Sequence, residues 1–252
     1  MHFTSSERRV DDVVERRFTL GEILGILWMP GSASPSEPVP LILAGQPGGP
    51  AGLDLAYPRL LGRAQSAAKA GFATATIELP GSGGRAEPAG VDQARAELRQ
   101  AVTAGEPVPD DLINRLVLPL VDQAVPEWQS ALDALLALPE IGDQVGYSGG
   151  VISIGTRLAA IEPRISAAVL FAGSFVPRSI MEEARNVAIP LYVLLQWDDE
   201  HNDRHMALDL FDAFGSQEKT LNANLGGHTG VPQYAGEEAA RFFTRHLSSF
   251  SG

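Results

Sequence analysis

One short stretch decides the fold predicted for this chain: Gly146-Tyr147-Ser148-Gly149-Gly150. It fits the pattern G-x-S-x-G, in which a strand turns so sharply into a helix that the central serine is exposed. The sharp turn leaves no room for side chains at the positions two residues before and two residues after the serine. The motif therefore predicts a strained backbone at Ser148. The flanking sequence fits the pattern, because a strand is predicted to end near Val145 and a helix to span 151–161.

The rest of the chain alternates apolar, strand-like runs with helical segments, which is typical of a mostly parallel, doubly wound sheet flanked by helices. Two strands around a glycine turn are predicted over 17–30. Further strands are expected at 40–44, 72–79, 165–171, 190–196 and 219–225, and helices at 53–70, 127–138, 205–214 and 234–246. The stretch 86–126 breaks this rhythm, so we expect a small, lid-like helical insertion within a single domain of 1–252.

A serine becomes a good nucleophile only when a base takes its proton. His228 is the best candidate, because it lies in a glycine-flanked loop directly after the last predicted strand. Asp198 and Asp199 follow the strand that ends at Gln196, and either carboxylate could orient the imidazole. The resulting chain order of serine, aspartate and histidine is the one associated with the α/β-hydrolase topology.

Two histidines elsewhere in the chain could instead indicate a metal site. His201 and His205 are four residues apart, and Asp209 follows after four more. No further ligand pattern accompanies them, so we interpret this segment as the solvated start of a helix and predict no metal.

On these landmarks the chain resembles the α/β-hydrolase superfamily, in its dienelactone-hydrolase-like and acyl-peptidase-like branch. The resemblance extends from Phe18 to Leu247. The matching segments are Pro40-Leu41-Ile42-Leu43 with its glycine-rich turn, Gly71-Phe72-Ala73, Leu79-Pro80-Gly81-Ser82-Gly83, the serine motif, the acid after Gln196, and Gly227-His228.

That resemblance implies Ser148 as nucleophile, His228 as base, an orienting aspartate and no cofactor. In this family the acid usually stands three residues after a position often held by glycine. Gln196 occupies that position here, which favours Asp199 and leaves Asp198 as the fallback.

Two backbone N–H groups are expected to hold the oxyanion. The first is that of Gly149, because it lies where the helix begins. The family implies a second donor from the loop after the 40–44 strand. Pro47 has no N–H to donate, so Gln46 is the best candidate, and Ala44 stands where many members carry histidine.

Composition excludes several classes of function. Nineteen basic and 31 acidic residues give a formal net charge of −12, which argues against nucleic acid or an anionic membrane surface as the partner. The chain has no cysteine, so disulfides, thiolate metal sites and a cysteine nucleophile are excluded. The polar start resembles no secretory signal, so a cytoplasmic location is expected. The oligomeric state cannot be read from the sequence.

The leading hypothesis is a serine hydrolase that cleaves a carboxylic ester or thioester of a small-molecule acyl substrate. A tailoring enzyme on the same fold, performing acyl transfer, lactone formation or C–C cleavage, is the first alternative. It is motivated by the insertion, which could exclude water from a pocket near Phe175 and Trp197; Tyr147 is a third possible pocket residue. The second alternative is a binding protein that has lost turnover.

Overall fold

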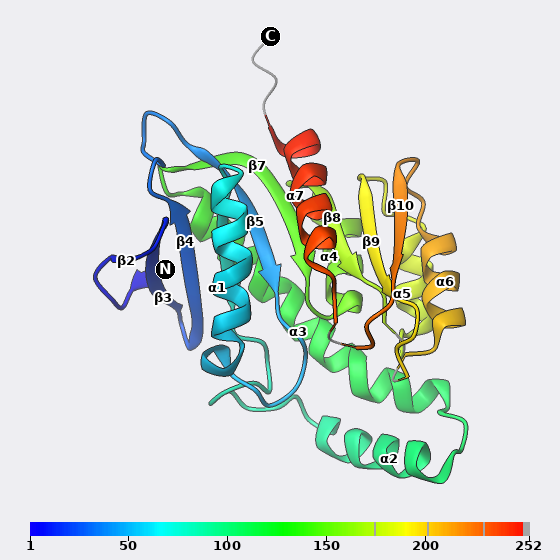
Figure 1. Ribbon diagram of the computed structural model, residues 1–252. Helices are drawn as coiled ribbons and strands as arrows, with labels where there is room; N and C mark the ends of the chain where they lie inside the picture. Colours follow the sequence, from blue (N-terminus) through cyan, green and yellow to red (C-terminus); the bar gives the residue numbers. More distant parts are fainter. Residues whose placement is uncertain (174, 201, 229, 249–252) are drawn as a thin grey trace.

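The computed structural model describes residues 1–173, 175–200, 202–228 and 230–248. Its strands are β1 (His2–Phe3), β2 (Arg8–Val10), β3 (Val13–Leu20), β4 (Ile23–Pro30), β5 (Val39–Gly45), β6 (Ala73–Ile77), β7 (Ile141–Gly149), β8 (Ile165–Phe171), β9 (Leu191–Gln196) and β10 (Lys219–Asn224). They form one ten-stranded sheet in the order β1-β3-β4-β6-β5-β7-β8-β9-β10, with β2 paired to β3 (Figure 1).

The sheet has a parallel part and an antiparallel part. Strands β6, β5, β7, β8, β9 and β10 are parallel to one another, whereas β1 to β4 form an antiparallel extension whose strand β4 pairs antiparallel with β6. The chain passes from β5 to β6 on one side and then returns to place β7 on the other. Such a reversal opens a crevice at the carboxyl ends of the two central strands, where ligands bind in open α/β sheets.

Helices cover both faces of this sheet (Figure 1). They are α1 (Leu53–Lys69), α2 (Val91–Ala104), α3 (Asp110–Leu136), α4 (Ile152–Ile161), α5 (Arg178–Ala184), α6 (Arg204–Ala213) and α7 (Gln233–Leu247). The largest hydrophobic cluster joins the sheet to α3, α4, α5 and α6. On the opposite face the core is divided into two clusters, one beneath α1 and one beneath α7.

The central strands are apolar because they are buried on both faces. In β5, Leu41 and Leu43 belong to the large cluster, whereas Ile42 and Ala44 belong to the clusters beneath α7 and α1. Successive side chains of a strand point to opposite faces, so burial on both sides requires an uninterrupted apolar run. The prediction of a doubly buried strand here is confirmed.

The insertion predicted for 86–126 contains α2 and the first part of α3. A helix was expected to begin at Glu127, but α3 runs without interruption from Asp110 through Pro119 and Pro126. A proline inside a helix removes one hydrogen bond and usually kinks or ends it. Tertiary packing outweighs that cost here, because α3 buries a long apolar stripe against the sheet and its neighbours, including Val121, Val125, Trp128, Leu132 and Leu135.

Other parts of the sheet and one short helix also differ from the prediction. Strand β7 does not end near Val145 but continues to Gly149, because Ala44 and Gly45 of β5 extend the ladder opposite Ser148 and Gly149. The short elements β1, β2 and α5 were not predicted. They are too short to show a clear hydrophobic period in the sequence.

A buried polar network attaches α1 to the antiparallel strands. The Glu15 carboxylate of β3 accepts hydrogen bonds from Trp28 Nε1 at 2.8 Å and from the Tyr57 hydroxyl at 2.7 Å. Glu15 is only 3% exposed, so these donors replace the water that its carboxylate would otherwise bind. Burial and the adjacent Glu15 carboxylate raise the pKa of Tyr57. The network therefore fixes α1 relative to the sheet edge.

Among the described residues, no helix combines the length and the apolar character needed to cross a lipid bilayer.

We expect Glu15→Ala to lower the free energy of unfolding by about 3 kcal/mol, because it leaves a buried indole N–H and a tyrosine hydroxyl without their acceptor. Urea denaturation at neutral pH measures the change. Glu22→Ala, at an exposed position of the β3–β4 turn, is the matched control and should stay within about 0.5 kcal/mol of the wild type. Equal losses in the two variants would contradict this role for Glu15.

Candidate active site

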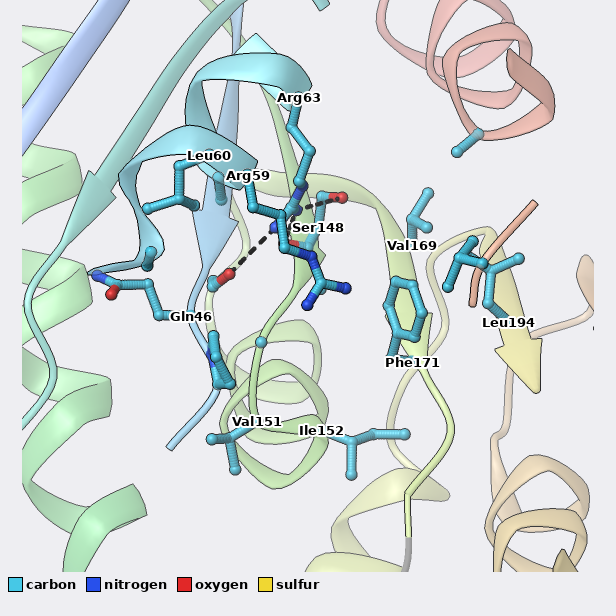
Figure 2. Close-up of a pocket in the computed structure, with 18 of the residues that line it drawn as sticks. Gln46, Arg59, Leu60, Arg63, Ser148, Val151, Ile152, Val169, Phe171 and Leu194 are labelled. Atoms are coloured by element: carbon cyan, nitrogen blue, oxygen red, sulfur yellow. Dashed lines mark hydrogen bonds between the residues drawn. The ribbon is translucent and has the colours of Figure 1, made fainter. Parts of the chain in front are cut away.

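Ser148 lies near the carboxyl end of β7, between Ala44 of β5 and Val169 of β8. Its neighbour Tyr147 points to the opposite face, where its ring packs edge-on against Trp128 of α3. The Ser148 side chain therefore points to the face covered by α1 and α7, which is where Figure 2 shows it. Strand pairing on both sides fixes the backbone that carries the hydroxyl.

The strained serine predicted from the motif is not observed. Among the described non-glycine residues, only Asp11 and Phe175 have positive φ angles. The left-handed conformations fall instead on Gly149 (φ 73°) and Gly150 (φ 75°), after which Val151 precedes the first turn of α4. Because two glycines follow the serine, they take the sharp turn at little steric cost, and Ser148 can remain in the strand.

The outer glycines of the motif are required by close packing. A Cβ atom at Gly146 would lie 2.6 Å from the Phe243 ring of α7. A Cβ atom at Gly150 would lie 2.8 Å from backbone atoms of Gly45 and 2.9 Å from the nitrogen of Gln46. The ends of β5 and β7 therefore approach each other at a distance that only glycine allows.

Gln46 is held firmly beside this approach. Its side chain is buried, and its amide Nε2 donates to the carbonyl oxygen of Ile77 at 2.5 Å. The carbonyl oxygen of Ala44 accepts a further hydrogen bond from the Thr76 hydroxyl. These contacts tie the end of β5 to β6 and fix the peptide of Gln46, one of the two expected oxyanion donors. Both Gln46 and Gly149, the other expected donor, border the same cavity.

The structure places His228 against Asp199. The imidazole Nδ1 lies 2.8 Å from Asp199 Oδ2, and the Asp199 side chain is only 2% exposed. Asn202 also donates a hydrogen bond to that carboxylate. A buried carboxylate on Nδ1 favours the tautomer that leaves Nε2 ready to accept a proton.

Asp198 has a different position and partners. Its carboxylate accepts hydrogen bonds from the backbone N–H groups of Gly226 and Gly227, with the shortest distances at 2.9 Å. The hydrogen bonds from Gly227 and Gly226 lower the pKa of Asp198. This aspartate therefore fixes the turn that carries His228, whereas its neighbour Asp199 contacts the imidazole itself.

Arg63 is a residue of the site that the sequence did not reveal. From α1 its guanidinium donates to the Ser148 hydroxyl at 3.0 Å, to the Ser148 carbonyl oxygen at 2.7 Å and to the Gly45 carbonyl oxygen at 3.3 Å (Figure 2). In the part of the chain that the structure describes, the hydroxyl bonds to Arg63 and not to the His228 ring. Burial lowers the pKa of Arg63 to about 10, and the nearby charge of Arg59 also contributes, yet Arg63 stays cationic at neutral pH.

These groups share one cavity of about 840 Å³ between α1 and α7, floored by β5, β7 and β8. Ser148, Asp199 and His228 all border it, at the carboxyl edge of the sheet. Its walls are otherwise mainly apolar, with Leu60, Phe171 and Leu194 among them. A concave apolar site with a few convergent polar groups is the usual form of a small-molecule site.

The three aromatic residues predicted as possible pocket walls lie elsewhere among the described residues. Tyr147 is fully buried on the other face of the sheet, where burial raises the pKa of its hydroxyl. Trp197 is 43% exposed and stacks against the Arg204 guanidinium at 4.3 Å. Phe175 does not border the cavity either. Sequence proximity to the acid and the nucleophile did not indicate which way these side chains point.

The histidine pair considered as a metal site is only partly described. His201 lies outside the described residues, and His205 is exposed in the first turn of α6, after the N-cap Asp203. Among the described residues, no group of three or more histidine and acidic side chains is arranged to hold a metal ion.

No protein-family model and no curated protein sequence matches this chain. Solved structures do match it over nearly its full length. A cold-adapted esterase from an Arctic intertidal metagenomic library has 25% identity and a TM-score of 0.74, covering 98% of this chain and 100% of that one.

Two more distant structures share the fold. Acetyl xylan esterase 1 from Thermoanaerobacterium has 14% identity and a TM-score of 0.64, covering 98% of this chain and 88% of that one. Dienelactone hydrolase from Anabaena variabilis has 19% identity and a TM-score of 0.59, with 96% and 99% covered.

We expect Gly150→Ala to lower the free energy of unfolding by about 2 kcal/mol or more, because the new methyl group meets the Gly45 backbone at a positive φ. Thermal or urea denaturation measures the loss. Gly84→Ala is the control, since a Cβ there has no atom within 4 Å. If Gly150→Ala were as stable as that control, the close approach of β5 and β7 would not be a constraint.

Asp198 should make the stability of its turn depend on pH. Its pKa is lowered from an ordinary value of 3.8 by folding, so its contribution is complete above that value and is lost as the pH falls through the folded pKa. We expect Asp198→Asn to be less stable than the wild type near pH 7, with the difference shrinking on acidification below about pH 4. Urea denaturation at several pH values tests this; a difference that is independent of pH would contradict it.

Proposed function

We propose that this chain, which has the α/β-hydrolase fold, is a serine hydrolase that cleaves carboxylic esters or thioesters of small-molecule acyl substrates through an acyl-enzyme on Ser148. One observation carries the proposal: Ser148 and the hydrogen-bonded pair of His228 and Asp199 border the same cavity at the carboxyl edge of the sheet. The likeness to the Arctic esterase at 25% identity supports ester bonds as the target.

In the proposed first step, the Ser148 hydroxyl attacks the carbonyl carbon of the ester and its proton passes to Nε2 of His228. Asp199, hydrogen-bonded at Nδ1, stabilises the imidazolium that forms. The oxyanion of the tetrahedral intermediate accepts hydrogen bonds from the backbone N–H groups of Gln46 and Gly149. The intermediate collapses to the acyl-enzyme as His228 returns its proton to the leaving alcohol or thiol.

The second step reverses these roles. Water gives a proton to His228 and attacks the acyl carbonyl, and collapse of the second tetrahedral intermediate releases the carboxylic acid while the proton returns to Ser148 Oγ. No group other than water is consumed.

The hydrogen bond from Arg63 defines a resting state in this scheme. Rotation about the single Cα–Cβ bond of Ser148 is enough to move Oγ away from Arg63, since the other two hydrogen bonds of that guanidinium go to backbone oxygens. We therefore propose that the serine turns towards His228 while the arginine stays in place.

We expect Ser148→Ala to lower the hydrolysis of p-nitrophenyl esters by about 10³-fold or more and to abolish labelling by a fluorophosphonate probe. Ser66→Ala is the control, because Ser66 also borders the cavity but lies on α1. Full esterase activity in the Ser148→Ala protein would exclude the mechanism. A folded wild-type protein that the probe does not label would exclude an activated serine.

A further inference from the structure

Two cationic side chains of α1 point into the cavity beside the nucleophile. Arg59 and Arg63 are one helical turn apart, and Figure 2 shows both guanidinium groups on the same side of the cavity as Ser148. Arg59 is exposed and Arg63 is half-buried. The pair therefore extends from solvent to the hydroxyl of the serine.

These arginines have no carboxylate partner among the described residues. Arg63 donates only to neutral oxygens, those of Gly45 and Ser148. The cavity lining contains one described carboxylate, Asp199, and that group is engaged by His228 and Asn202. Other partly buried arginines of this acidic chain are matched to acids, as Arg85–Glu127, Arg157–Glu183 and Arg164–Glu162 show.

Two arginines without a carboxylate partner destabilise the protein when no ligand is bound. Like charges four residues apart on a helix destabilise it, and a cation withdrawn from water without a counterion costs more. The lowered pKa of Arg63 has these same two causes, burial first and the Arg59 charge second. The net charge of −12 does not prevent an anion from approaching, because exposed charges beyond about 8 Å are largely screened at physiological salt.

We propose that Arg59 and Arg63 form a carboxylate-binding subsite, so that the preferred ester carries a carboxylate a few atoms from its scissile carbonyl. This inference rests on the proposed function and names its substrate class. Of the five N–H groups of Arg63, three already donate within the protein, which leaves two for a ligand. Because Arg63 also lies 3.0 Å from Ser148 Oγ, a carboxylate held by it is close to the reacting carbonyl.

The length of the link follows from the same geometry. A carboxylate oxygen binds a guanidinium nitrogen at about 2.8 Å, and an attacking oxygen approaches its carbonyl carbon at about 3 Å. In the resting rotamer Oγ lies 3.0 Å from the guanidinium, and rotation about the Cα–Cβ bond of Ser148 keeps the two groups within a few ångströms, so a chain of two or three methylene groups can join the two ends. Monoesters of succinate and glutarate have this length.

The catalytic test compares monoethyl glutarate with ethyl valerate, which has a methyl group in place of the carboxylate. We expect the wild type to favour the acidic ester in kcat/KM. Arg59→Gln should lower the ratio of the two kcat/KM values by about tenfold, mainly through KM for the acidic ester. Arg99→Gln, at an exposed position of α2 away from the cavity, is the control and should keep the wild-type ratio. An unchanged ratio in Arg59→Gln would overturn the subsite.

A binding measurement separates this inference from the proposed function. Glutarate itself, which has no ester bond, is titrated calorimetrically into the wild type, Arg59→Gln, Arg63→Lys and Arg99→Gln. Binding to the wild type and to Arg99→Gln, weakened in the other two, supports the subsite even if no ester is cleaved. Hydrolysis of neutral esters by a wild type that does not bind glutarate would refute the subsite and leave the proposed function standing.

Discussion

The close approach of β5 and β7 at their carboxyl ends is the constraint on which the rest of the site depends. A Cβ atom at Gly150 would lie 2.8 Å from the backbone of Gly45, and one at Gly45 would lie 2.7 Å from the carbonyl oxygen of Gly149. That approach extends the strand ladder to Gly149, places Ser148 on a fixed backbone and brings the peptide of Gln46 beside it. Arg63 reinforces the same contact, because its guanidinium bridges carbonyl oxygens of both strands.

Two adjacent aspartates in the loop after β9 bind the loop after β10, each through a different group. Asp198 holds the backbone of the glycine turn, and Asp199 holds the imidazole that the turn presents. Both acids lie in the turn that follows β9, so one short segment fixes both the loop after β10 and the side chain that this loop carries. The histidine is therefore positioned by β9 as much as by its own loop after β10.

The strand and helix order could be read from the sequence because the central strands are buried on both faces and are apolar throughout. The prolines of α3 misled that reading, since packing of the helix on the sheet outweighs the local cost of Pro126. Ser148 and His228 could be predicted to lie at one edge of the sheet because glycine-rich turns follow their strands, whereas the preference for Asp199 over Asp198 came from the family resemblance. Arg63 could not be predicted, because a long side chain on α1 reaches Ser148 only through the tertiary arrangement of that helix.

The three tryptophans of the chain differ in solvent exposure, so intrinsic fluorescence can distinguish them. Trp28 and Trp128 are sealed in the interior at 1% and 0% exposure, whereas Trp197 stands at the surface, two residues before Asp199. A collisional quencher such as iodide can reach only the third indole while the protein is folded. The fraction of the fluorescence that iodide quenches therefore comes from Trp197 and reports on the loop that carries Asp199, without any introduced dye.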